Sequence, residues 1–239
     1  MSENKRIESM EELLSAFFAF DKNEDAVFSC PRFVRIIAEV FLGKESDSIF
    51  HFALDDDSIS CVITKLKEQM MACCPQCPQA LNNPLTYLLD ELMCNIQQHA
   101  QTDKGLAYLG YNKSTDSLEI LVADLGITIF GSYVAAQKHL DKLGNSDADA
   151  LNLAQNGYSV KNLPDAENRG YGISSNLKMV VDGLRGEFAI FSGNAILIYS
   201  DRGKKILSLP AELDFKGTMV LAIVPVHIPA EFNMYKYTS

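Results

Sequence analysis

The stretch DELMCNIQQHA occupies residues 90–100 and completes the most regular helical pattern in the chain. Apolar residues recur on one face from Leu85 to Ile96, which predicts an amphipathic helix over residues 85–100. Glu91 and Asn95 are four residues apart, so such a helix places them on the same face, one turn apart. A carboxylate and an amide in this arrangement suit the orientation of water and the binding of Mg²⁺. Two polar residues on a solvated helix face would give the same pattern.

The residues after this helix predict further strands with helices between them. Residues 106–112 and 118–124 read as a hairpin, and helices are expected at 131–143 and 173–183. The polar, irregular segment 144–169 is typical of a lid or binding loop. The last predicted strands are 187–191, 195–200, 205–209 and 219–224. The expected fold class is α+β: a two-layer α/β sandwich with a mixed, largely antiparallel sheet.

Residues 1–78 are expected to form a small α/β unit, which precedes the larger domain at 79–239 and is a candidate for partner binding. Its predicted elements are helices at 8–20, 33–42 and 59–72 and strands at 26–29 and 49–54. The boundary is placed in the segment CCPQCPQALNNP at 73–84, because its prolines are turn signals between two periodic regions.

Three more motifs place polar or glycine residues at the ends of predicted elements. VADLGITI (122–129) ends a strand in Asp124, and Gly126 follows. A strand-end carboxylate can accept a hydrogen bond from an exocyclic amine, and glycine permits close approach of a ligand. RGYGISSN (169–176) is a glycine-rich turn that opens a helix, where backbone N–H groups suit phosphate. KGT (216–218) precedes the last strand. Each motif alone also reads as an ordinary turn.

In this order, the four motifs resemble the N, G1, G2 and G3 boxes of the Bergerat-fold (GHKL) ATPases. That superfamily includes DNA gyrase, the large heat-shock chaperones, sensor histidine kinases and mismatch-repair proteins. The resemblance spans residues 80–226. It is strongest to stand-alone bacterial histidine-kinase-like ATP-binding proteins, which often carry a G-x-S/T-x-K lid element before RGYGL; GYSVK stands at 157–161 here. The resemblance implies the Bergerat fold, with ATP and Mg²⁺ as cofactors.

The resemblance also implies a role for each candidate site residue. Asn95 would coordinate Mg²⁺, and Glu91 would be the general base or water-orienting carboxylate. Asp124 would bind the adenine amine, Gly126 would let the base lie against the sheet, and Thr218 would support Asp124. The other ATP-binding residues implied by the resemblance are Ile129, Lys161, Arg169, Gly170, Tyr171 and Gly172.

The chain departs from the family pattern in the G1 box, which usually reads DxGxG. Thr128 replaces the second glycine and is expected to stiffen the turn or crowd the pocket. His99, one turn after Asn95, is read as a packing or capping residue rather than a phosphoacceptor. No other histidine lies in the helical hairpin typical of a sensor kinase, and too few residues follow Thr218 for a gyrase-like transducer domain.

Composition and charge restrict the function classes. The 239 residues are 47% hydrophobic and 22% charged, an ordinary globular composition. The net charge of −10 argues against broad nucleic-acid binding. The N-terminus has no apolar signal region, and no apolar run approaches the roughly 18 residues of a membrane span, so a cytoplasmic protein is expected.

The six cysteines are expected to be reduced thiols. Cys74 and Cys77 form a CxxC pair, but no second pair follows, so a loop with free thiols is favoured over a zinc site. Thiol or metal sensing at Cys73, Cys74 and Cys77 is kept as a minor alternative.

The chain is therefore expected to bind ATP through a histidine-kinase-like ATPase domain. It would hydrolyse ATP slowly or phosphorylate a partner protein in a regulatory pathway, as anti-sigma-factor kinases do; Glu91 favours retained chemistry. The alternative is a non-enzymatic regulatory module that uses nucleotide only as a switch. The expected partners are a nucleotide and a protein, without nucleic acid or membrane, and a homodimer is left open.

Overall fold

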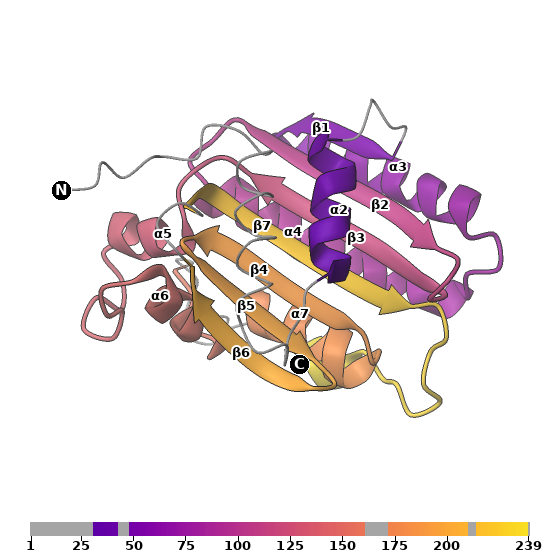
Figure 1. The fold of residues 1–239 in the computed structure, drawn as a ribbon. Helices are drawn as coiled ribbons and strands as arrows, with labels where there is room; N and C mark the ends of the chain where they lie inside the picture. The colour runs from indigo at the N-terminus through magenta and orange to yellow at the C-terminus, as the bar shows by residue number, and fades with distance from the viewer. Residues whose placement is uncertain (1–30, 43–47, 161–171, 210–213, 239) are drawn as a thin grey trace.

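The computed structural model describes residues 31–42, 48–160, 172–209 and 214–238. Its centre is a seven-stranded sheet in the order β1-β2-β3-β7-β4-β5-β6 (Figure 1). The strands are β1 (Ile49–Ala53), β2 (Lys104–Asn112), β3 (Ser117–Asp124), β4 (Glu187–Gly193), β5 (Ala195–Ser200), β6 (Gly203–Ser208) and β7 (Phe215–Pro225). Every neighbouring pair is antiparallel, which confirms the α+β class and corrects the prediction of a mixed sheet.

The helices of the described residues are α2 (Pro31–Leu42), α3 (Asp56–Cys73), α4 (Asn82–His99), α5 (Ile129–Ala136), α6 (Asp147–Gln155), α7 (Ile173–Lys178) and α8 (Tyr235–Thr238). A short 3₁₀ turn, η1 (Gln79–Leu81), precedes α4, and a π-helical turn, η2 (Met179–Gly183), follows α7. Within the described ranges, no helix combines the length and apolar character needed to cross a membrane.

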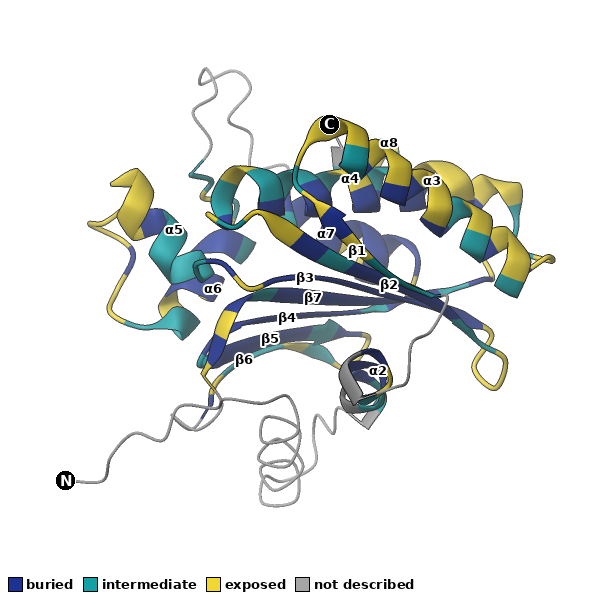
Figure 2. Cartoon of the chain, turned by 90° about the horizontal axis from the view of Figure 1, so that it is seen from above, coloured by how far each residue is buried: buried dark blue, intermediate teal, exposed yellow. Residues whose placement is uncertain are grey.

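The two faces of the sheet are covered by different helices. Because side chains alternate along a strand, Leu118, Ile120 and Val122 of β3 pack into the core under the helix layer. Leu121 and Ala123 point to the opposite face and pack in a second cluster with α2. Figure 2 shows α3, α4 and α7 on one side of the sheet and α2 on the other. Both faces of β3 are therefore buried.

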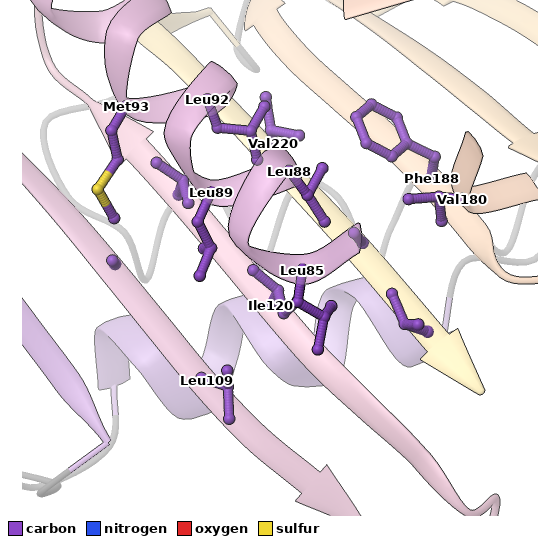
Figure 3. Packing of buried hydrophobic residues seen from close by; sticks show 14 of the residues in the cluster. Leu85, Leu88, Leu89, Leu92, Met93, Leu109, Ile120, Val180, Phe188 and Val220 are labelled. Carbon is purple, nitrogen blue, oxygen red and sulfur yellow. The ribbon is translucent and has the colours of Figure 1, made fainter. Parts of the chain in front are cut away.

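The predicted apolar stripe of α4 anchors the main core. Leu85, Leu88, Leu89 and Leu92 are almost wholly buried. Figure 3 shows these side chains directed toward the strands, close to Ile120 and other core residues. Fully burying one leucine contributes about 2 kcal/mol. The packing fixes the rotation of α4 about its axis and so determines where Glu91 and Asn95 lie.

The described part of residues 1–78 belongs to the same sheet and core as the rest of the chain. β1 pairs with β2 in register, and Leu66 of α3 lies in the core cluster that also holds the α4 leucines. Gln97 of α4 also donates from Nε2 to the backbone oxygen of Leu54 at 3.0 Å. The predicted elements 8–20 and 26–29 lie outside the described residues.

Two segments between β3 and β4 differ from the prediction. The helix expected at 131–143 ends at Ala136, because Gln137 adopts a left-handed conformation with φ of 53°. The segment 144–169, expected to be irregular, contains α6. Ser146 caps that helix by accepting a hydrogen bond from the backbone N–H of Asp149 at 3.1 Å.

Candidate functional site

A cavity of about 240 Å³ lies between α4, α5, the end of α6 with the residues that follow it, the start of α7, the end of β3 and the first half of β7. Six of the residues proposed from the sequence line it: Glu91, Asn95, Asp124, Ile129, Gly172 and Thr218. Most of the remaining wall is apolar and includes Leu92, Ile96, Val122, Ile173 and Val220. Lys161, Arg169, Gly170 and Tyr171 lie outside the described residues. A mostly apolar cavity with a few polar groups is typical of a small-molecule site.

Asp124 is the buried acid of the cavity. It ends β3, is only 4% exposed, and accepts a hydrogen bond at Oδ1 from the Gly126 backbone N–H at 2.8 Å. Burial raises the pKa of Asp124 to about 6, although hydrogen bonds from the backbone N–H groups of Gly126 and Thr218 work in the opposite direction. The carboxyl group is therefore ionised at neutral pH and can accept a hydrogen bond from a ligand.

Ser192 connects β4, β7 and the start of α5, and the sequence did not predict this role. This buried residue of β4 has its Oγ 3.1 Å from Oγ1 of Thr218 and accepts a hydrogen bond from the Ile129 backbone N–H at 2.9 Å. Ser192 thereby holds β7 and the start of α5 at the cavity. A single serine near the end of a strand gave no signal in the sequence.

Gly217 explains why β7 begins earlier than predicted. Its φ of 107° suits glycine, and a Cβ atom there would lie 2.2 Å from the backbone oxygen of Asp124. Glycine thus lets β7 continue closely past the end of β3 and brings the Thr218 N–H to the Asp124 carboxyl group.

Glu91, Asn95 and Gly172 meet at another part of the wall. Gly172 has a φ of 128°, and a Cβ atom built on it would lie 3.7 Å from both amide atoms of Asn95 and 3.8 Å from Oε2 of Glu91. Nδ2 of Asn95 is buried and has no hydrogen-bond partner among the residues that the structure describes. The predicted N box and the last glycine of the predicted G2 box are therefore neighbours in space.

Gly126 and Thr128 have structural roles that the sequence did not predict. Gly126 is not a lining residue; a Cβ atom there would lie 1.7 Å from the backbone oxygen of Ala100, so glycine lets the loop pack against the end of α4. Thr128 does not line the cavity either, and its φ of −71° is open to any residue. Its Oγ1 caps α5 by accepting a hydrogen bond from the Gly131 N–H at 3.1 Å. The expected crowding of the pocket by Thr128 is therefore not seen.

Aromatic side chains form a further part of the wall. Tyr133 and Tyr158 line the cavity, and the Tyr133 hydroxyl donates to the backbone oxygen of Tyr158. The His139 ring makes edge-to-face contacts with both tyrosines, and its Nε2 lies 3.0 Å from the backbone oxygen of Ser159. His99, expected to be a packing residue, also lines the cavity. The sequence analysis did not single out Tyr133, and it included Tyr158 only as part of the GYSVK segment.

The cysteine segment lies at the end of α3, away from the residues that line the cavity. The Cys77 and Cys74 side chains are hydrogen-bonded to each other, and burial raises the pKa of Cys77 to about 12. These thiols are therefore protonated at neutral pH. The described residues contain no group of three or more His, Cys, Asp or Glu side chains placed to hold a metal ion.

Neither the protein-family models nor the curated proteins compared with this chain gave a match.

Proposed function

We propose that the chain binds ATP with Mg²⁺ in this cavity, as a histidine-kinase-like domain of the Bergerat type. It would hydrolyse ATP slowly or transfer phosphate to a partner protein. One observation carries the proposal: Glu91, Asn95, Asp124, Gly172 and Thr218 come from α4, β3, the turn before α7 and β7, yet all line one cavity.

Asp124 would recognise the base. A purine has a flat apolar body that suits the aliphatic and tyrosine walls, and adenine carries an exocyclic amine that can donate to the Asp124 carboxylate. Because this carboxylate is buried, leaving it without a matching donor in a complex is costly. The cavity would therefore discriminate against bases that present an acceptor at this place.

The oxygen donors of Asn95 and Glu91 fit a hard cation. An amide oxygen and a carboxylate on one helix face are ligand types that Mg²⁺ accepts, usually together with substrate phosphates and water. Asn95 would hold the ion, with Glu91 beside it. When bound, Mg²⁺ would offset the negative charge of the phosphates, which a neighbouring carboxylate would otherwise repel.

Glu91 would act as the base. Its Oε2 lies near Gly172 at the cavity wall and would accept a proton from an attacking water or from a hydroxyl of a partner protein. The surrounding apolar residues would limit the access of bulk water and so restrict wasteful hydrolysis.

A non-enzymatic regulatory module is the second candidate. Among the described residues that line the cavity, Glu91 and Asp124 are carboxylic acids, and none is a lysine or arginine. Cationic side chains stabilise the charge that develops in phosphoryl transfer. This part of the site thus suits nucleotide binding better than rapid turnover.

Turnover of Mg-ATP by purified protein tests the enzymatic reading. Wild type and Glu91→Gln should bind a non-hydrolysable ATP analogue with similar affinity, whereas Glu91→Gln should lose about 100-fold or more in turnover because a base is removed. Asp90→Asn is the matched control, since Asp90 is the neighbouring carboxylate on the exposed side of α4 and does not line the cavity.

Three results would revise the proposal. Binding without turnover by wild type would select the non-enzymatic module. Equal turnover by wild type and Glu91→Gln would exclude Glu91 from the mechanism. No binding of the analogue by folded wild type would reject both readings.

A further inference from the structure

The hydroxyl group of Ser192 lies behind the cavity wall and has three hydrogen-bond neighbours. The residue is 1% exposed and does not itself line the cavity. Its Oγ accepts a hydrogen bond from the Ile129 backbone N–H at 2.9 Å, lies 3.2 Å from the backbone oxygen of Gly217, and lies 3.1 Å from Oγ1 of Thr218. A serine hydroxyl donates one proton and accepts at two lone pairs, so one donated and two accepted bonds use its full capacity.

The partners determine the direction of each bond. A backbone carbonyl only accepts, so the contact with Gly217 takes the proton of Ser192. Gly217 is buried where the β4–β7 register shifts, and in the described strands no register pair of β7 includes it. Because the Ser192 proton is used there, the contact between the two hydroxyl groups requires the proton of Thr218. The Thr218 hydroxyl therefore donates to Ser192.

Thr218 then offers an acceptor to the cavity, which it lines. Its only hydroxyl proton is directed at Ser192, so Oγ1 has a lone pair left for a ligand. The backbone N–H of Thr218 donates to the carboxyl group of Asp124, which places that carboxyl group beside the same residue. Two acceptors, one from β7 and one from β3, are therefore neighbours at this part of the wall.

We infer that Ser192 is a positioning residue for base recognition: it keeps the Thr218 hydroxyl proton away from the cavity, so that Thr218 and Asp124 together accept both hydrogens of a primary amino group. A threonine hydroxyl that is free to rotate serves either as donor or as acceptor. With its proton held by Ser192, it serves only as acceptor. A ligand that carries an oxygen in place of the amine meets two acceptor oxygens there and is rejected.

The inference rests on the proposed function, because the amino group in question is the exocyclic amine of adenine. It adds a residue outside the four motifs that suggested the site. It also separates two parts of selectivity: Asp124 and Thr218 contact the base, whereas Ser192 acts through Thr218 without lining the cavity.

Ser192→Ala releases the Thr218 hydroxyl and tests the inference. Titration calorimetry compares a non-hydrolysable ATP analogue with its inosine counterpart, which carries an oxygen in place of the amine, both with Mg²⁺. Wild type should bind the ATP analogue at least about tenfold more tightly. Ser192→Ala should bind the ATP analogue about fivefold more weakly and the inosine analogue about threefold more tightly, because the released hydroxyl can donate to that oxygen.

Ser117→Ala is the matched control, since Ser117 is also a buried strand serine whose Oγ lies 2.7 Å from a threonine hydroxyl, that of Thr115, but neither residue lines the cavity. Its affinities for both analogues should remain at the wild-type values. Ser192→Thr retains the hydroxyl group and should retain the wild-type preference for the ATP analogue.

A purely structural role of Ser192 would weaken the binding of both analogues, whereas redirection of the Thr218 proton strengthens the binding of one. If Ser192→Ala loses affinity for both analogues equally, or keeps the wild-type affinities, the inference is overturned and the proposed function stands. If wild type binds neither analogue, both fall.

Thr218→Val covers the case in which Ser192→Ala does not fold. Valine has the shape of threonine but removes the acceptor oxygen. Affinity for the ATP analogue should therefore fall about tenfold, whereas affinity for the inosine analogue should change less than about twofold. If Thr218→Val bound the ATP analogue as tightly as wild type, the hydroxyl oxygen would not contact the amine, and the inference would be overturned.

Discussion

Asp124 combines two properties that seldom occur together in a folded protein: it is almost wholly buried, and among the described residues no cationic side chain contributes to the shift of its pKa. Backbone N–H groups of Gly126 and Thr218 hold the carboxyl group in place instead. A residue that is costly to bury and has no cation beside it in the described part of the chain is a candidate for function.

The pH dependence of stability tests this description. The folded-state pKa of about 6 lies above the ordinary value of 3.8. Between these values the folded protein keeps a proton that the unfolded chain has lost, so the free energy of unfolding falls as the pH rises, by about 3 kcal/mol in total. Asp124→Asn should remove this decrease and should be more stable than wild type at pH 7.

Urea unfolding between pH 4 and pH 7.5 measures the effect. Asp103→Asn is the control. Because Asp103 is exposed, its substitution should leave the dependence of the free energy of unfolding on pH as in wild type. If the free energy of unfolding changed with pH in the same way in wild type and in Asp124→Asn, Asp124 would not titrate as described.

Gly126 is required by close packing rather than by its backbone conformation. Gly126→Ala would place Cβ 1.7 Å from the backbone oxygen of Ala100, which cannot move without shifting the end of α4. We expect a loss of about 3 kcal/mol in the free energy of unfolding. Gly203→Ala, where φ is 114° but no atom lies within 4 Å, should cost only about 1 kcal/mol. If chemical denaturation gave the same loss of unfolding free energy for Gly126→Ala and Gly203→Ala, the packing explanation would be contradicted.

At the scale of elements, α2 is held to the sheet by an ion pair as well as by apolar contacts. Arg35 pairs with Glu119, a β3 residue whose side chain is 3% exposed, and Asn112 also donates to that carboxylate at 2.9 Å. Removing the cation would leave a buried charge without its partner.

Arg35→Leu should therefore lower the free energy of unfolding by about 3 kcal/mol, and the double variant with Glu119→Leu should recover part of the loss. Arg32 provides the matched comparison, since it lies on the same helix and pairs with Glu187 at 2.8 Å, but the two side chains are 40% and 32% exposed. Arg32→Leu should cost less than about 1 kcal/mol. Similar losses for the two arginine variants, measured by thermal unfolding, would argue against a special role of the buried pair.

The elements that the sequence predicted best are those with a strong apolar period. The helix that carries Glu91 and Asn95 and the hairpin that ends in Asp124 lie where they were expected. Both have apolar residues at the regular spacing that packing into the core requires, and this spacing can be recognised in the sequence. α6 was not predicted because its segment is rich in polar residues. The sequence does contain a helix-start signal there, since Ser146 and Asp149 form a cap three residues apart and buried apolar residues follow. The early end of α5 could not be predicted, because Gln137 is neither glycine nor proline, the residues that usually indicate the end of a helix.

The site was predictable in part. Residues in motifs, such as Asp124 and Gly172, lie at the cavity because the motifs mark the ends of elements. Tyr133 lines the same cavity, and Ser192 contacts Thr218 there, only through the pairing and packing of distant segments, which a single sequence does not encode locally. Gly126 was correctly marked as a special position, but its closest constraint comes from Ala100 rather than from the cavity.

At the scale of the whole molecule, one core extends across the predicted boundary at residue 78. Leu66 of α3 and Leu88 of α4 are both 0% exposed and belong to the same cluster. Leu66→Ala and Leu88→Ala should each destabilise the protein by about 2–5 kcal/mol and should shift the same cooperative transition. Calorimetry that resolved two transitions, with Leu66→Ala moving only one of them, would instead support separate units.

The central claim is that the cavity binds adenine nucleotide through Asp124, and base selectivity tests it most directly. We expect wild type, titrated with non-hydrolysable ATP and GTP analogues in the presence of Mg²⁺ at pH 7.5, to bind the ATP analogue at least about tenfold more tightly, because guanine presents an acceptor where adenine presents its amine. Asp124→Asn should lose most of this preference. Equal affinities of wild type for the two analogues, or an unchanged preference in Asp124→Asn, would contradict the account.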